Sequence, residues 1–192
     1  MRSIRVLAAA IAAAALSGCA DGPVVPSSEA IAPPTGPLAS HSSSASVEYQ
    51  VHMQNYGWEA WVGNGQVAGH PGEGLRLEAF ALNWYSGAFN GGPFEPCWDG
   101  VCPEPPRVCY QAHVQDYGWQ APVCGNGQYV GTTGQARRME AVAIWLEGDT
   151  DEGICYEVYV QTYGWQGLSC NGQVAGTTGQ GLRLEAIAVH TY

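Results

Sequence analysis

The chain has 192 residues, 26 of them glycine, and a formal net charge of −10 at pH 7. Its 17 acidic residues outnumber seven arginines, and it has no lysine. Such a surface repels phosphate backbones, so we expect no nucleic-acid partner. The sequence also contains no Gly-x-Ser-x-Gly elbow, no His-Glu-x-x-His pair and no phosphate-binding loop. We therefore expect a protein that is not an enzyme and binds no cofactor or metal.

Residues 1–19 have the features of a bacterial export signal. Two arginines precede an apolar run over residues 6–16, which is too short to span a bilayer. The run ends in Leu-Ser-Gly-Cys at 16–19, which resembles the lipobox of bacterial lipoproteins, whose cysteine is lipidated. We expect Cys19 to anchor the protein in a lipid bilayer at the cell envelope, with the outer membrane or cell surface favoured. The alternative is an ordinary cleaved signal peptide.

Residues 20–46 are rich in proline, serine and alanine and lack runs of large apolar residues. Such a segment cannot bury enough apolar surface to offset its ordering entropy, so we predict a disordered tether. The remainder, 47–192, has the length of one ordinary domain.

A repeated unit organises this domain. Tyr-Gly-Trp occurs three times, and each copy is followed by Asn-Gly and then by Arg-x-Glu-Ala. The three copies span 47–84, 108–146 and 154–192, with an insertion at 85–107. A unit of this size cannot bury a core alone, so the copies must share one interior.

Within each unit the apolar residues have a period of two. Tyr49, Val51 and Met53, for example, alternate with polar residues, as in a half-buried strand. The Asn-Gly pairs at 64–65, 126–127 and 171–172 predict hairpin turns. We expect four strands per unit, no helix, and an all-β head with pseudo-threefold symmetry. A β-trefoil is favoured, and a β-prism is the alternative.

The cysteine pattern predicts two disulfides inside units. Aligning the units on Tyr-Gly-Trp superposes one cysteine pair of the second unit on a pair of the third, while the first unit has Glu48 and Gly63 there. Both cysteines of the pair are present in two units and both are absent from the first, which indicates that the two cysteines of a unit bond to each other. The predicted bonds are Cys109–Cys124 and Cys155–Cys170.

Cys97 and Cys102 bracket a turn-like sequence in the insertion, and we predict a third, local disulfide between them. Disulfides place the domain in an oxidising compartment, consistent with export. A zinc site at these cysteines is disfavoured because the sequence has no second close-spaced ligand pair.

Taken together, the Gly-Trp, Asn-Gly, Gly-Thr-Thr-Gly and Arg-Leu-Glu-Ala motifs resemble the clostridial hydrophobic W (ChW) repeat. The resemblance covers nearly all of 47–192 outside the insertion, and the first unit departs from it with His70-Pro71 in place of Thr-Thr. It implies a secreted or surface bacterial protein whose repeats mediate attachment or macromolecular binding. It specifies no ligand.

An arginine and a glutamate stand two residues apart near the start of each last strand, so their side chains are expected to share a face. That face continues with Phe80 and Leu82 in the first unit, so we expect it to point inward. The predicted role is a partly buried structural ion pair, and a ligand clamp is the alternative. The pairs are Arg76 with Glu78, Arg138 with Glu140, and Arg183 with Glu185.

The signature tryptophans have two interpretations: core residues, or platforms that stack on sugar rings. They are Trp58, Trp119 and Trp165. Polar side chains on the outward strand face are candidates to bind sugar hydroxyls, although a solvated strand face is the plainer interpretation. These candidates are His52, His113, Gln54, Gln115 and Gln161.

Three weak, equivalent sites would gain affinity by avidity on a repeating polymer. We therefore predict a non-catalytic cell-surface module that binds a polysaccharide, or another surface macromolecule. The alternative is a structural or protein-adhesion lipoprotein of the cell envelope. The sequence does not specify an oligomeric state.

Overall fold

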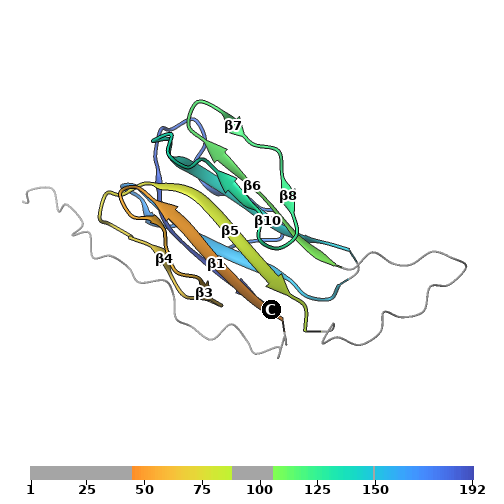
Figure 1. Ribbon diagram of the computed structural model, residues 1–192. Helices are drawn as coiled ribbons and strands as arrows, with labels where there is room; N and C mark the ends of the chain where they lie inside the picture. Colours follow the sequence, from red (N-terminus) through yellow and green to blue (C-terminus); the bar gives the residue numbers. More distant parts are fainter. Residues whose placement is uncertain (1–44, 88–105, 149) are drawn as a thin grey trace, which may run out of the picture.

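The computed structural model describes residues 45–87, 106–148 and 150–192, and their regular structure consists of 15 β-strands (Figure 1). No helix in this part of the chain is long and apolar enough to span a bilayer. The prediction of an all-β head built from three repeats is confirmed. The predicted signal peptide, Cys19, Cys97 and Cys102 lie outside the described residues, as does nearly all of the predicted tether.

Each repeat contributes two long strands and three short ones. Repeat 1 contains β1 (Ser46–Met53), β2 (Gly57–Trp58), β3 (Val62–Gly63), β4 (Ala68–Gly69) and β5 (Leu77–Tyr85). Repeat 2 contains β6 (Arg107–Val114), β7 (Gly118–Trp119), β8 (Val123–Cys124), β9 (Tyr129–Gly131) and β10 (Met139–Glu147). Repeat 3 contains β11 (Ile154–Val160), β12 (Gly164–Trp165), β13 (Ser169–Cys170), β14 (Ala175–Gly176) and β15 (Leu184–Thr191).

The strand count differs from the expected four because the segment after the signature tryptophan is interrupted. It forms two separate two-residue strands, such as β2 and β3, and both pair with the first strand of the repeat. The strand bounds differ slightly from the predicted ones as well. β1 begins at Ser46, inside the predicted tether. β5 ends at Tyr85 and β6 begins at Arg107, and both of these residues lie inside the predicted insertion.

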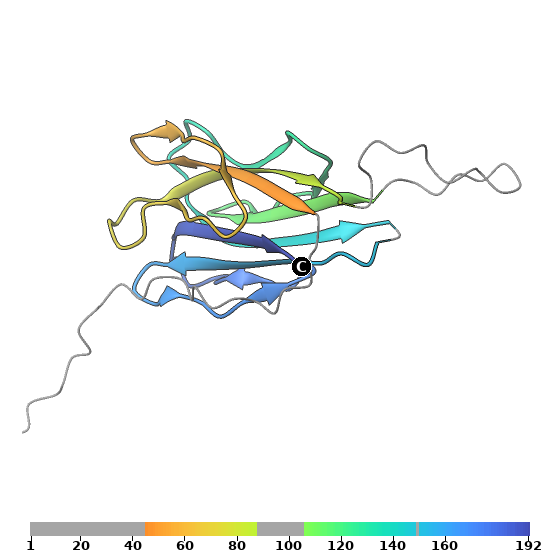
Figure 2. The ribbon, with the colours of Figure 1, turned by 90° about the horizontal axis from the view of Figure 1, so that it is seen from below.

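The short fourth strand of each repeat belongs to the sheet of another repeat. The long first and last strands of a repeat pair with each other, and the far edge of the last strand receives the fourth strand of the next repeat. Thus β9 joins β5, β14 joins β10, and β4 of repeat 1 joins β15 of repeat 3. The exchange closes in a ring, and Figure 2 shows the strands of repeat 3 packed beside those of the other two. No repeat completes its sheet alone.

A glycine is required where each exchanged strand meets its host. Gly69, Gly131 and Gly176 have φ values of 97°, 98° and 103°. A Cβ at these positions would lie 2.5, 2.3 and 2.4 Å from a carbonyl oxygen of the host strand. Both the positive φ and this close approach exclude a side chain. The first glycine of the Gly-Thr-Thr-Gly motif is therefore explained by inter-repeat packing.

Three buried tyrosines link the repeats at the centre. Tyr49, Tyr110 and Tyr156 are fully buried, and each hydroxyl contacts backbone of its own repeat and of the preceding one. The Tyr110 hydroxyl donates to the Gln128 carbonyl at 2.6 Å and accepts the Leu82 N–H at 3.2 Å. Tyr49 and Tyr156 likewise accept the N–H groups of Val189 and Ile144, at 3.1 and 3.0 Å, and donate to the carbonyls of Gln66 and Gln173.

Burial disfavours the charged phenolate, and it raises the pKa of both Tyr49 and Tyr110 to about 12. These hydroxyls therefore stay protonated at any physiological pH and remain available as donors to the neighbouring carbonyls.

Both intra-repeat disulfides are present, which confirms the pairing read from the repeat alignment. Cys109–Cys124 and Cys155–Cys170 join residues that face each other across paired strands. In repeat 1 the equivalent cross-strand pair is Glu48 and Gly63. A loop of this length corresponds to about 3 kcal/mol of stabilisation per bond in the chain-entropy model.

Replacing Tyr110 with phenylalanine tests the inter-repeat links. We expect Tyr110→Phe to lower the free energy of unfolding by about 1–3 kcal/mol, because a buried N–H and a carbonyl lose their partner. The measurement is urea denaturation. Tyr163→Phe is the matched control, since its hydroxyl bonds only the exposed Gln180 side chain. Equal losses in the two variants would contradict the assigned role.

Candidate binding site

A β-bulge in each repeat positions a buried glutamate. In repeat 1, His52 pairs with Ala79 and Met53 pairs with Leu77, so Glu78 is an extra residue without a cross-strand partner. Glu140 and Glu185 are skipped in the same way in repeats 2 and 3. A bulge redirects the side chain at which it occurs. The expectation that Glu78 points inward with Phe80 is therefore wrong, because the bulge breaks the alternation on which it relied.

The redirected carboxylates are buried on the outer side of the sheets. Their residues are only 5%, 4% and 2% exposed, and each pairs with the arginine two residues earlier. Arg76 places Nε and a terminal nitrogen 2.8 and 2.7 Å from Glu78 Oε1. Arg138 with Glu140 and Arg183 with Glu185 have the same geometry at 2.8–3.0 Å. The ion pairs expected from the sequence are thus present.

The second carboxylate oxygen distinguishes the repeats. Nδ1 of His52 lies 3.2 Å from Glu78 Oε2, and Nδ1 of His113 lies 3.1 Å from Glu140 Oε2, although neither contact has the alignment of a full hydrogen bond. Tyr159 replaces the histidine in repeat 3. There the free oxygen of Glu185 accepts the N–H of Gly72 from repeat 1 at 2.8 Å.

Each signature tryptophan lies at the surface, next to the histidine or tyrosine ring just described. Trp58 meets His52 edge to face with centroids 5.5 Å apart, and Trp119 meets His113 at the same distance. Trp165 meets Tyr159 at 5.7 Å. Trp58 and Trp119 are 39% and 38% exposed, and Trp165 is half-buried. None of the three signature tryptophans therefore belongs to the buried core.

The neighbouring repeat completes each cluster. The N–H of Thr132 donates to the Glu78 carbonyl at 2.8 Å, and Thr177 and His70 make the same contact with Glu140 and Glu185. We name the resulting surfaces by their composition. Seam 1 comprises Trp58, His52 and Glu78 with β9; seam 2 comprises Trp119, His113 and Glu140 with β14; seam 3 comprises Trp165, Tyr159 and Glu185 with β4.

The family model described as Clostridial hydrophobic W matches residues 52–84, 113–148 and 159–191, more than half of the chain. The chain belongs to the ChW family. ChW repeats are a cell-surface-associated repeat family. The search of curated proteins found no match, and neither did the search of solved structures.

The candidate glutamines of the ChW repeats lie opposite the arginines. The backbone N–H groups of Gln54, Gln115 and Gln161 donate to the carbonyls of Arg76, Arg138 and Arg183 at 2.9–3.0 Å. The structure therefore brings the predicted histidines to the tryptophans and the predicted glutamines to the ion pairs. Sequence reasoning did not predict the threonines from the neighbouring repeat. Their only signal was the Gly-Thr-Thr-Gly motif, which carries no indication of strand exchange.

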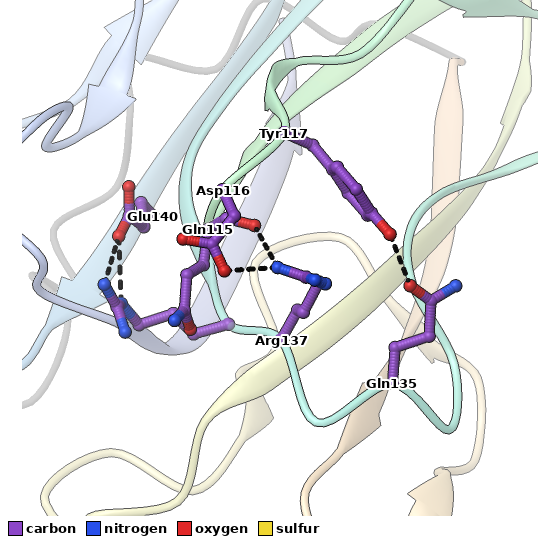
Figure 3. A network of polar contacts seen from close by, with 7 residues as sticks. Gln115, Asp116, Tyr117, Gln135, Arg137 and Glu140 are labelled. Atoms are coloured by element: carbon purple, nitrogen blue, oxygen red, sulfur yellow. Dashed lines mark hydrogen bonds and ion pairs between the residues drawn. The ribbon is translucent and has the colours of Figure 1, made fainter.

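Repeat 2 carries an additional cation next to its ion pair (Figure 3). Arg137 contacts the Asp116 carboxylate and the Gln115 carbonyl, and its guanidinium lies 4.5 Å from the centre of the Tyr117 ring. The Tyr117 hydroxyl in turn donates to Gln135 Oε1 at 2.9 Å. The residues equivalent to Arg137 in the other ChW repeats are Leu75 and Leu182, so the contacts of Arg137 are specific to repeat 2, whereas the tyrosine–glutamine bond recurs in repeat 3.

One group of possible metal ligands occurs among the described residues. The sulfurs of Cys109 and Cys124 and a carboxylate oxygen of Glu147 lie within 4.8 Å of one another. The two sulfurs are bonded to each other, so neither is a thiolate that could coordinate a metal.

Seam 3 contains a histidine between two carboxylates. His70 Nε2 lies 2.7 Å from Glu59, Nδ1 lies 3.4 Å from Glu73, and the ring stacks on Tyr56 with centroids 4.8 Å apart. Burial lowers the pKa of His70, but the hydrogen bonds and charges of Glu59 and Glu73 outweigh it. The net effect raises the pKa of His70 above 6.5.

This shift predicts a pH-dependent stability of seam 3. Because the folded pKa is above the unfolded one, the contribution of His70 is fully present below about pH 6.5 and is lost as the pH rises through the folded pKa. His70→Thr introduces the residue that the other two repeats have at this position. We expect the difference in Tm between wild type and this variant to shrink as the pH rises above about 6.5 and through the raised pKa of His70. A difference independent of pH would refute the assignment.

Proposed function

We propose that this protein is a non-catalytic binding module of the bacterial cell envelope, and that its signature tryptophans hold a polysaccharide. One observation carries the proposal: Trp58, Trp119 and Trp165 all lie at the surface, each edge to face with a ring from the first strand of its repeat, and two of these rings, His52 and His113, lie against a buried glutamate. A half-exposed indole offers an apolar face for a sugar ring, and adjacent polar groups can bond its hydroxyls.

The threefold arrangement suits a repeating ligand. The three seams lie on one ring of sheets, so a polymer that occupies one of them raises the effective concentration of its next segment at another. Weak individual sites then give a useful total affinity.

The carboxylates of the seams do not suit hydrolysis. Glycoside hydrolysis in most families requires two carboxyl groups flanking one bond, about 5–10 Å apart. The glutamates shared by the repeats lie in different sheets, and each already pairs with an arginine. Their role in the proposed function is to hold the neighbouring rings.

A pull-down on insoluble polysaccharides tests the proposal. We expect the wild-type protein to be retained by at least one polymer, and the triple variant Trp58→Ala/Trp119→Ala/Trp165→Ala to be released. Trp61→Ala is the matched control, because Trp61 is 41% exposed but is not a signature tryptophan. Near-UV circular dichroism and urea denaturation confirm that each variant is folded.

Two results would refute polysaccharide binding: no retention of wild type on any polymer, or full retention of the triple variant.

A protein-adhesion function is the second candidate. It is favoured by the exposed tyrosines that precede each signature tryptophan, Tyr56, Tyr117 and Tyr163, since surface tyrosine is typical of protein interfaces. Capture of an envelope protein that free sugars do not displace would favour that function.

We also propose that the module is exported and held in a bilayer through lipid at Cys19, on the evidence of the Leu-Ser-Gly-Cys sequence. Stable anchoring needs more than one acyl chain. A Cys19→Ser variant should move from the membrane fraction to the soluble fraction of the envelope, as measured by immunoblotting. Unchanged membrane association would exclude this anchor.

A further inference from the structure

We infer that seam 1 is the principal binding position and that it takes a neutral, hydroxyl-rich sugar in the corner formed by Trp58 and Tyr129. The inference rests on the proposed function and deepens it. It assigns the site to two repeats jointly, and it adds Tyr129, which lies outside the motifs shared by the repeats.

The two aromatic rings form a corner. Trp58 comes from β2 of repeat 1 and Tyr129 from β9 of repeat 2, with ring centroids 5.8 Å apart and planes at 76°. They are 39% and 54% exposed, so both rings are open to solvent. A pyranose ring can stack on one ring while its edge packs against the other. The corner exists because β9 is exchanged onto β5.

The other seams lack the second ring. The residue equivalent to Tyr129 is Val174 at seam 2 and Val67 at seam 3. At seam 3, Tyr159 also replaces the histidine equivalent to His52, and the second carboxylate oxygen of Glu185 already accepts the N–H of Gly72. The expected order of affinity is therefore seam 1, then seam 2, then seam 3.

His52 supplies a directional hydrogen-bonding atom beside the corner. The Glu78 carboxylate faces Nδ1 at 3.2 Å, so Nε2 is the ring nitrogen that remains for a ligand. It lies on the side of Gly57, where even an added Cβ would be 3.9 Å away, and a sugar hydroxyl can hydrogen-bond to it.

A second polar atom at seam 1 has no partner. Thr132 follows β9, is 5% exposed, and carries a hydroxyl without a hydrogen bond within the described protein. Buried hydroxyls of this kind are normally satisfied. A ligand that reaches the seam with hydroxyl groups of its own can satisfy it.

Charge selects a neutral sugar. The chain has a formal net charge of −10, and Arg76, the arginine next to the seam's glutamate, is paired with Glu78. An acidic polysaccharide would meet repulsion without a free cation to offset it at this seam. A neutral polymer meets no such penalty.

The repeats provide their own test. Tyr129→Val installs the residue that occupies this position in the other two repeats, so the fold should tolerate it. Binding isotherms are measured by depletion on cellulose, mannan and chitin, and on polygalacturonate as the anionic probe. On the neutral polymer that retains wild type, we expect Tyr129→Val to bind about tenfold more weakly, as loss of one aromatic contact predicts.

Two further variants complete the experiment. Val174→Tyr should strengthen binding, because it builds the same corner at seam 2, and Trp165→Ala should weaken binding less than Tyr129→Val does, because seam 3 has no corner. This inference would be overturned, and the proposed function would still stand, in either of two cases. In the first, Tyr129→Val binds as well as wild type; in the second, Trp165→Ala weakens binding as much as Tyr129→Val does. Preference for polygalacturonate would overturn the neutral-sugar assignment. Failure of wild type to bind any polymer would overturn both proposals.

Discussion

The exchange of one short strand between successive repeats is the constraint on which the structure depends. Each repeat ends in a long strand whose outer edge is covered by β4, β9 or β14 of the next repeat. Uncovered, such an edge would present unpaired N–H and carbonyl groups. The same junction positions the buried tyrosines, since Tyr110 reaches from its own hairpin to the backbone of Leu82. A single repeat would lose both sets of partners, so the repeats fold together.

The binding surface is a product of this junction. The bulge that turns Glu78 outward also leaves its carbonyl free to accept the N–H of Thr132. The β-bulge at Glu78 thus has two consequences. Its carbonyl binds the neighbouring repeat, and its carboxylate faces His52, which packs against Trp58. The proposed site and the fold are therefore coupled, because a ligand at seam 1 would contact the two chain segments whose pairing holds the ring together. Binding there would stabilise this pairing by an amount that rises with the ligand concentration relative to Kd.

Local patterns were enough to predict the repeats, the long strands of each repeat and both described disulfides. The alternation of apolar residues at Tyr49, Val51 and Met53 correctly predicts which side chains of β1 are buried. The absence of both cysteines from repeat 1, at Glu48 and Gly63, correctly indicates which cysteines pair in the other repeats. The orientation of Glu78 could not be predicted, because period-two reasoning assumes a regular strand and the bulge removes one step. Strand exchange was equally hidden, since Gly131 reads as an ordinary turn glycine until its contact with a different repeat is known. Whether Trp58 is buried or exposed could not be predicted either, because part of its surroundings comes from β9 of a different repeat.

Seam 3 has to close the ring without a short chain connection. It joins the first repeat to the last, and there the Tyr49 hydroxyl and the Ala45 carbonyl accept bonds from Val189 and Thr191. The departures of repeat 1 from the shared pattern fall at this junction, where His70 replaces threonine and Gly72 bonds to Glu185. The residue equivalent to His70 at seam 1, Thr132, carries a hydroxyl without a hydrogen-bond partner in the described protein. We therefore interpret the asymmetry as a division of labour: seam 3 uses its polar groups to hold the ring closed, whereas seam 1, joined through the chain, leaves them available to a ligand.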